Sequence, residues 1–250
     1  MAADPIHQFQ ITKLFTIGHI GGQEIAFTSS SAYMFLAVAV ISLLMIGGSA
    51  GRQLVPGRVQ SMAELSYEFV ASMIKSTAGS EGMKFFPLVL SLFMFICVSN
   101  VVGIIPYAFT VSSHLIVTAA LALLVFFIVL IYGLYRNGLK FFKLFVPSGV
   151  PIYILPLVVF IEVISFFLKP VSHSVRLFAN MLAGHIALKV FASFVGMLGA
   201  LGIIGWAGAV LPLGLTIALT ALELLVAFLQ SYVFAILTCI YLNDAIHPGH

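Results

Sequence analysis

The sequence predicts an all-α membrane protein that forms a single membrane domain. Apolar residues make up 62% of its 250 residues and charged residues only 8%, whereas a soluble domain contains roughly 25% charged residues. The 11 basic and 8 acidic side chains are separated by long uncharged intervals. This composition excludes a cytosolic enzyme, a nucleic-acid-binding protein and a disordered chain.

The N-terminal part of the chain predicts an outer segment followed by one span. Residues 1–30 contain no cationic start followed by an apolar core, so no cleaved signal or transit peptide is expected. Residues 31–51 are uncharged and long enough for a bilayer crossing of about 20 residues. Arg52 and Arg58 follow at once. Because basic residues mark the cytoplasmic end of a span, the N-terminus is predicted to lie outside.

Residues 61–84 predict an amphipathic helix on the membrane surface. Glu64, Glu68 and Lys75 lie on one face and would enter hydrocarbon if the helix crossed the bilayer. The apolar positions at helical spacing are Met62, Leu65, Phe69 and Met73. Ser61 and Glu64 also fit a capping box at the start of the helix. A helix packed on a partner protein is the alternative interpretation of this pattern.

Residues 85–135 predict a hairpin of two membrane spans. They contain no charged residue, and Pro106 and a short polar group after it interrupt the apolar run. A basic cluster follows, made of Arg136, Lys140 and Lys143. This cluster lies on the same side as the earlier arginines only if the amphipathic helix does not cross the membrane.

Two overlong apolar stretches, residues 150–198 and 209–243, complete the chain. As one helix the first would be roughly 70 Å long, although the hydrocarbon layer is only ~30 Å thick. We expect it either to fold back at Pro156 or Pro170 or to lie strongly tilted in the membrane. Regularly spaced glycines between the two stretches predict a turn or a close-packing zone.

The first of these stretches carries a polar stripe on an otherwise apolar helix. At ~100° per residue its members fall within about 50° of one line. They are Glu162, Lys169, Ser172, His173, Arg176 and Asn180. A charge at the centre of a membrane helix costs about 2.5–3.5 kcal/mol, so it persists where it faces a wet cavity or a partner charge. Arg176 is therefore expected to be functional, and a structural ion pair with Glu162 is the alternative.

A second set of polar residues is shared between the two long stretches. His185 lies half a turn round the helix from Arg176, whereas Glu223 and Gln230 share one face of the last helix. An apolar site leaves Glu223 in need of a partner, and His185 is the expected one. Arginine cannot hand on a proton, but histidine and glutamate can. The pattern therefore predicts a barrier to protons flanked by access routes.

Three of the polar residues also have simpler interpretations. Lys169 could snorkel to the membrane interface. His173 could be a polar residue that is satisfied inside the protein. Asn100, in the predicted hairpin, is more typical of an interhelical hydrogen bond than of a ligand-binding group.

Residues 174–185 (SVRLFANMLAGH), together with Glu223 and residues 229–234 (LQSYVF), resemble subunit a of the F-type ATP synthase. The Arg-Leu-Phe-Ala-Asn motif that begins at Arg176 is highly specific. The similarity extends over nearly the whole chain, including residues 5–9 and 100–106.

The resemblance implies a non-catalytic stator subunit that translocates protons. Arg176 would face a carboxylate of a rotating ring of c subunits, with Asn180 and Gln230 nearby. His185 and Glu223 would line a proton-access half-channel. Glu162 matches an acid of the same polar pathway, and the supporting polar residues would be His173, Ser172, Lys169 and Asn100.

The resemblance also implies partners and a location. The expected partners are the c-subunit ring, the peripheral-stalk b subunits, membrane lipid and protons, with no nucleic acid, cofactor or metal. The expected location is a bacterial inner membrane with the C-terminus in the cytoplasm. A mitochondrial inner membrane, with an organelle-encoded chain, is the alternative.

Two other functions fit part of the pattern. A proton-coupled secondary transporter also holds charges near the membrane midplane, but it should show paired broken helices and a substrate-sized pocket. A membrane haem protein needs facing histidines, whereas His173 and His185 lie on different faces. The sequence has neither a His-Glu-x-x-His motif nor a phosphate-binding loop, so neither proteolysis nor ATP hydrolysis by this chain is expected.

Overall fold

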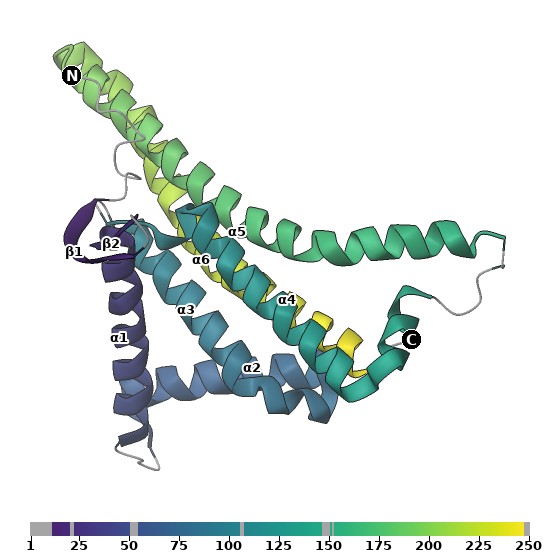
Figure 1. Cartoon of the computed structure of the whole chain (residues 1–250). Helices are drawn as coiled ribbons and strands as arrows, with labels where there is room; N and C mark the ends of the chain where they lie inside the picture. Colours follow the sequence, from purple (N-terminus) through teal and green to yellow (C-terminus); the bar gives the residue numbers. More distant parts are fainter. Residues whose placement is uncertain are drawn as a thin grey trace. The chain divides into compact units, whose positions relative to one another are not determined.

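The computed structural model describes residues 12–20, 23–50, 55–105, 108–146, 151 and 153–247, and they form a predominantly helical chain (Figure 1). Among these residues, five helical segments are long and apolar enough to cross a membrane. The predicted class, an all-α membrane protein, is confirmed. Two features used in the sequence analysis lie outside the described residues. They are Arg52 and residues 5–9, which form part of the family resemblance.

A β-hairpin precedes the first helix and was not predicted. Strand β1 (Lys13–Ile20) pairs antiparallel with β2 (Gln23–Thr28). The rings of Phe15 and Phe27 stack on the hairpin with their centroids 5.0 Å apart. Helix α1 (Ser29–Ala50) follows directly, and the first span was predicted over residues 31–51. Part of the segment predicted over residues 1–30 is therefore a β-hairpin.

Helix α2 (Arg58–Gly82) begins three residues earlier than the sequence predicted. Its N-cap is Gly57, which makes no side-chain hydrogen bond, so the capping box of Ser61 and Glu64 is wrong. Because the helix already includes Ser61, Glu64 lies in the second turn, where it accepts a hydrogen bond from Gln60 Nε2 at 2.8 Å.

The buried face of α2 also differs from the predicted apolar face. The buried positions are Ala63, Val70, Ala71, Met73, Ile74, Ala78 and Gly82. Three of the four predicted positions, Met62, Leu65 and Phe69, are exposed. Small residues allow α2 to pack closely against α1. A Cβ atom on Gly48 of α1 would lie only 2.6 Å from the Cβ of Ala63 of α2.

Helices α3 (Phe86–Ile104) and α4 (Leu115–Asn137) occupy the region that was predicted to form a hairpin of two spans. A 3-10 turn, η2 (Met83–Phe85), precedes α3, and a second, η3 (Val111–Ser113), lies in the polar connection. The last turn of α4 contains a basic side chain, Arg136, which forms an ion pair with Glu81. The 3-10 segment η4 (Gly138–Phe145) follows, and Gly138 adopts the left-handed conformation that ends α4.

The two C-terminal stretches form α5 (Leu155–Gly199) and α6 (Ile203–Ile246). Pro156 lies in the first turn of α5 and Pro170 lies inside the helix, which nevertheless continues to its end. The expected fold-back at either proline is therefore wrong. Helix α6 begins six residues earlier than the predicted stretch. Gly202, with φ of +80°, makes the predicted turn between the two helices.

Contacts divide the chain into two compact units that share several of these helices. The first contains residues 1–42, 95–114 and 177–230, and the second contains residues 43–94, 115–176 and 231–250. Aromatic rings fill part of the second unit, where Phe166 packs against Phe126 at 5.1 Å and against Phe145 at 5.3 Å.

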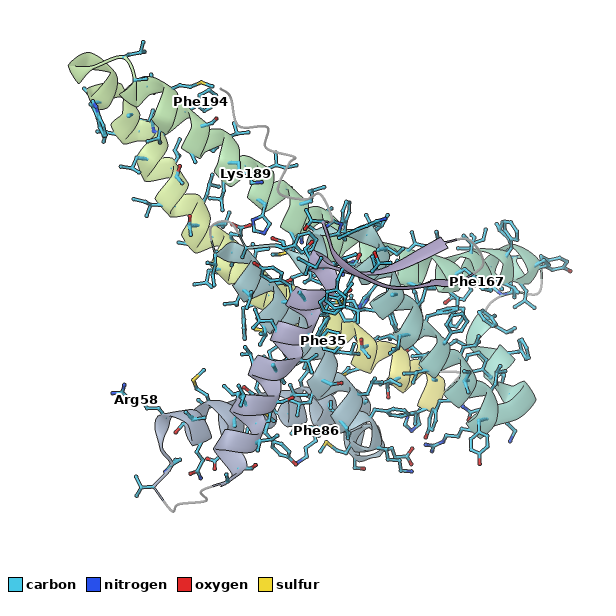
Figure 2. The ribbon with its side chains drawn as sticks, turned by 60° about the vertical axis from the view of Figure 1, so that its left-hand side comes forward. Phe35, Arg58, Phe86, Phe167, Lys189 and Phe194 are labelled. Atoms are coloured by element: carbon cyan, nitrogen blue, oxygen red, sulfur yellow. The ribbon has the colours of Figure 1, made fainter. Side chains whose placement is uncertain are left out.

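Large apolar side chains also cover the outside of the helices. Phe35, Phe167 and Phe194, all labelled in Figure 2, are exposed on α1 or α5. In water such a surface would be unfavourable, whereas in hydrocarbon it costs nothing. The exposed apolar surface therefore agrees with a multi-pass membrane protein.

We expect Gly205→Ala to destabilise the turn between α5 and α6. A Cβ atom on Gly205 would lie 2.0 Å from the carbonyl oxygen of Leu198, and a backbone atom cannot move aside cheaply. The overpacking should cost about 1–3 kcal/mol. The measurement is the temperature at which helicity is lost in detergent micelles. Gly208→Ala is the control, since its nearest contact is an ordinary 3.9 Å. Equal melting temperatures for the two variants would contradict this prediction.

Candidate functional site

The polar stripe of α5 is divided by burial. Ser172, Arg176 and Asn180, which lie one helical turn apart in sequence, are exposed. His173 is buried, whereas Glu162 and Lys169 are half-buried. The stripe predicted from spacing therefore separates into an exposed line centred on Arg176 and residues that face the protein.

Arg176 is exposed and forms no ion pair with a carboxylate of the described residues. The alternative interpretation required an ion pair with Glu162, which lies fourteen residues earlier on the same helix. That separation is roughly 21 Å along the axis, too far for the two side chains to meet. The structure thus leaves the guanidinium available to a group outside the chain.

His185 and Glu223 form the predicted pair in the first compact unit. Nδ1 of His185 on α5 lies 3.3 Å from Oε1 of Glu223 on α6, and both side chains are buried. Within the described part of the chain neither carboxylate oxygen of Glu223 has a hydrogen-bond partner. The approach to the imidazole is therefore the main polar contact of the carboxylate.

Gly184 explains how the carboxylate of Glu223 comes so close to α5. A Cβ atom at this position would lie 2.9 Å from Oε1 of Glu223. Because glycine has no side chain, the carboxylate can lie against the helix next to His185. The Gly-His pair at residues 184 and 185 therefore provides both the space and the partner.

Thr110 was missed by sequence reasoning. Its Oγ1 lies 2.9 Å from Nε2 of His185 and donates a hydrogen bond to the carbonyl oxygen of Gly103 at 3.4 Å. A hydroxyl has only one proton to donate, so the contact with His185 is donated by Nε2–H. This bond selects the tautomer of His185 that turns an unprotonated Nδ1 towards Glu223. The sequence feature that could have indicated Thr110 is the nearby polar group that interrupts the predicted hairpin.

Amide side chains form three further hydrogen bonds in the same unit. Asn180 Nδ2 donates to Gln230 Oε1 at 2.9 Å. Asn100 Nδ2 donates to the carbonyl oxygen of Ala227 at 3.3 Å, and Asn100 Oδ1 accepts from Ser112 Oγ. The expectation that Asn100 makes an interhelical hydrogen bond is confirmed.

Lys169 and His173 belong to the second compact unit. Lys169 Nζ lies 3.1 Å from Oδ2 of Asp244, so it binds an acid that sequence reasoning missed instead of snorkelling as an isolated charge. His173 is buried with neither ring nitrogen hydrogen-bonded to a described residue, so its interpretation as a satisfied polar residue is wrong.

The described residues contain no group of three or more His, Cys, Asp or Glu side chains that could hold a metal ion. One pair of titratable groups, His185 and Glu223, has Thr110 beside it. Imidazole and carboxylate groups can bind and transfer protons.

Comparison of the amino-acid sequence with known proteins shows which family the chain is similar to. The family model described as ATP synthase A chain matches residues 31–243. The chain is 88% identical to ATP synthase subunit a of Rhodopseudomonas palustris (strain BisB5) over 250 residues, which is 100% of both chains. It is 78% identical to ATP synthase subunit a of Bradyrhizobium diazoefficiens over 251 residues, again covering 100% of both. The protein of that name from Nitrobacter winogradskyi is 78% identical over 247 residues, 99% of each chain.

Thr110→Val should destabilise the first compact unit. Valine keeps the shape of threonine but cannot accept the proton of His185 Nε2, and a buried polar group without a partner costs about 1–3 kcal/mol. Thermal unfolding in detergent micelles, followed by circular dichroism, measures the loss. Thr110→Ser keeps the hydroxyl and should retain most of the stability. A valine variant as stable as the serine variant would argue against the hydrogen bond.

Proposed function

The chain belongs to the ATP synthase A chain family, the membrane-sector subunit of the F-type ATP synthase, and on this premise we propose how it moves protons. Protons pass between two aqueous half-channels that are separated by Arg176. Between the half-channels they are carried on the carboxylates of a rotating ring of c subunits. Catalysis of ATP synthesis belongs to other subunits of the complex.

The observation that carries the proposal is the exposed guanidinium of Arg176, which forms no ion pair with an acid of the described residues. Within a membrane such a cation is stabilised by an acid on a neighbour or by water. A guanidinium attracts a carboxylate and favours its ionised form, but it does not give up its own proton. Arg176 therefore discharges a passing protonated acid and blocks the direct route between the half-channels.

Blocking the direct route matters because the membrane potential supplies the energy. One elementary charge that crosses 100 mV releases ~2.3 kcal/mol. If protons passed straight from one half-channel to the other, that energy would be lost as heat. With Arg176 in place, each proton completes its crossing by rotation of the ring.

The access route on one side consists of Glu223, His185 and Thr110. The hydrogen bond with Thr110 fixes the Nε2 proton of His185, so the ring presents a lone pair at Nδ1 to Glu223. One further proton then has two acceptors 3.3 Å apart, the imidazole nitrogen and the carboxylate oxygen. A proton arriving at either group can pass to the other without movement of the helices.

The other side of Arg176 carries Glu162, which is half-buried on the same helix. We assign it to the second half-channel, with Ser172 as an exposed polar residue between it and Arg176. Asn180 and Gln230, which are hydrogen-bonded to each other, line the path on the side of His185.

The proposed setting is a bacterial inner membrane, with the N-terminus outside and the C-terminus in the cytoplasm. The partners are the c-subunit ring, which faces Arg176, and the peripheral-stalk b subunits. Helix α2 lies on the cytoplasmic membrane surface, where its exposed apolar side chains contact lipid. The continuity of α5 and α6 counts against a secondary transporter, which would show paired broken helices.

Arg176→Lys should abolish coupled ATP synthesis while the complex still assembles. Lysine is a compact cation that can lose its proton when desolvated, so it neither holds the carboxylate in two-pronged geometry nor blocks protons reliably. Synthesis in membrane vesicles should fall at least about tenfold, a change of ~1.4 kcal/mol in a barrier. Ser193→Ala, at an exposed position of α5 outside the polar stripe, is the control. Normal ATP-driven proton pumping by the lysine variant would falsify this role of Arg176.

Glu223→Gln should slow proton flux through the membrane sector. Glutamine keeps the size of the side chain but cannot carry a proton, so the passage between His185 and residue 223 is interrupted. Passive proton flux, measured in inverted vesicles from which the catalytic sector has been removed, should fall roughly tenfold or more. Thr220→Val, on an exposed position of α6, should leave it unchanged. Equal flux in the glutamine variant and the wild type would count against a channel role for Glu223.

A further inference from the structure

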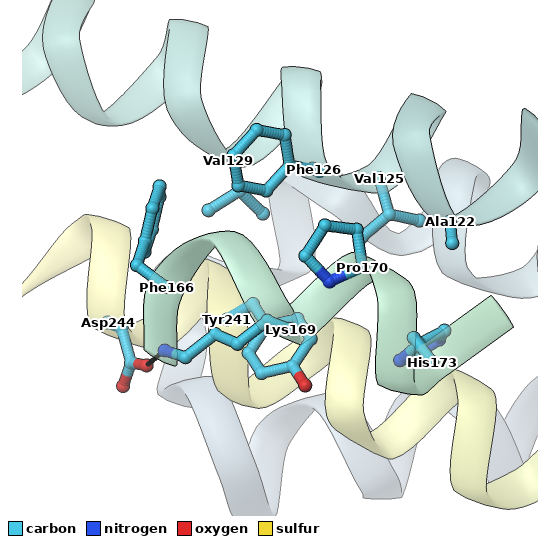
Figure 3. A pocket seen from close by; sticks show the side chains of 10 residues that line it. All are labelled: Ala122, Val125, Phe126, Val129, Phe166, Lys169, Pro170, His173, Tyr241 and Asp244. Atoms are coloured by element: carbon cyan, nitrogen blue, oxygen red, sulfur yellow. Dashed lines mark hydrogen bonds and ion pairs between the residues drawn. The ribbon is translucent and has the colours of Figure 1, made fainter. Parts of the chain in front are cut away.

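A small cavity lies in the second compact unit (Figure 3). Its volume is about 20 Å³, and its wall is formed by α4, α5 and α6. Much of the wall is apolar, contributed by residues such as Ala122 and Val125 of α4. The polar side chains in the wall are Lys169, His173, Tyr241 and Asp244.

His173 is the least explained residue of this wall. It is only 4% exposed, and neither of its ring nitrogens has a hydrogen-bond partner among the described residues. Its ring meets Phe234 edge-on at 3.8 Å, a contact through which an N–H can point at the aromatic face. That contact can satisfy one nitrogen at most. A buried polar atom without a partner costs about 1–3 kcal/mol, so the second nitrogen requires another partner.

Pro170 supplies a second polar group that requires a partner. Proline has no backbone N–H, so the carbonyl oxygen of Phe166, four residues earlier, lacks its usual helical donor. Both residues line the cavity. Inside a membrane a freed carbonyl is satisfied by a side chain or by ordered water. The cavity thus lies at a break in the hydrogen bonding of α5.

The ion pair of Lys169 and Asp244 forms another part of the cavity wall. Besides its 3.1 Å contact with Asp244, Lys169 Nζ lies 5.0 Å from the ring centroid of Tyr241. The two charges neutralise each other, so the cavity attracts neither an anion nor a second cation. The side chains of Lys169 and Asp244 are 25% and 33% exposed, so a small molecule can enter past them.

We propose that this cavity binds a buried water molecule that hydrogen-bonds to His173. A cavity holds a water molecule when its volume is at least roughly 10–15 Å³ and its wall offers two to four polar partners, and this cavity meets both conditions. The water donates a hydrogen bond to the free nitrogen of His173 and accepts one from a donor in the wall, such as the hydroxyl of Tyr241. A larger ligand does not fit the volume. The water positions the imidazole of His173 three residues before Arg176.

The test is hydroxyl-radical footprinting of the intact complex, because a radical formed from a bound water oxidises the side chains beside it. Phe166, in the cavity wall, and Phe93, outside it, are each 4% exposed. We expect Phe166 to be oxidised at least about threefold faster than Phe93, since only Phe166 lies next to the proposed water. Equal rates in the wild type would overturn the proposal.

Two variants identify the source of the oxidation. Ala122→Val fills the cavity with two methyl groups, and His173→Phe removes both ring nitrogens but keeps an aromatic ring against Phe234. Each should reduce oxidation of Phe166 to the rate of Phe93. Ala37→Val adds the same methyl groups at a buried site on α1 and should change neither rate. Unchanged oxidation of Phe166 in both cavity variants would contradict the water site.

Thermal stability distinguishes a hydrated cavity from a dry one by the sign of the change. Filling a dry apolar cavity stabilises a protein, whereas expelling a bound water from His173 leaves a buried nitrogen unpaired and destabilises it. Ala122→Val should therefore lower the melting temperature, and the loss should be smaller when His173→Phe is also present. A higher melting temperature for Ala122→Val would overturn the proposal.

Discussion

Hydrocarbon cannot hydrogen-bond, and this constraint decides how every polar side chain of the long helices is placed. Glu223 lies against His185, Lys169 binds Asp244, and Asn100 reaches a backbone carbonyl. Arg176 is different, because no acid of the described residues pairs with it. An exposed cation on a membrane helix, with no acid partner among the described residues, is the feature on which the proposed function rests.

The close approach of His185 and Glu223 depends on small features that have little to do with charge. Gly184 leaves room for the carboxylate, and Thr110 holds the imidazole by its other nitrogen. Without the glycine the carboxylate would be displaced, and without the threonine the tautomer of His185 would not be fixed. The position of the two titratable side chains therefore depends on the absence of a side chain at Gly184 and on the hydroxyl of Thr110.

The sequence was informative where the signal is local or strong. Uncharged runs predicted the helices that can cross a membrane, and a buried acid with one nearby histidine predicted the pair of Glu223 and His185. Thr110 and Asp244 were missed because their partners lie 75 residues away and a single polar residue gives no periodic pattern. The capping box at Ser61 failed because packing extended α2 by a turn, and a local pattern cannot register that effect.

The length of α5 connects these local contacts to the movement of protons across a membrane. Its 45 residues correspond to a contour of roughly 67 Å, about twice the thickness of the hydrocarbon layer. A helix of that length can remain within the layer only if it is strongly inclined from the membrane normal or curved. Arg176 lies near the middle of this helix. In the proposed function, Glu162 precedes and His185 follows the arginine along the helix, as two separate access routes require.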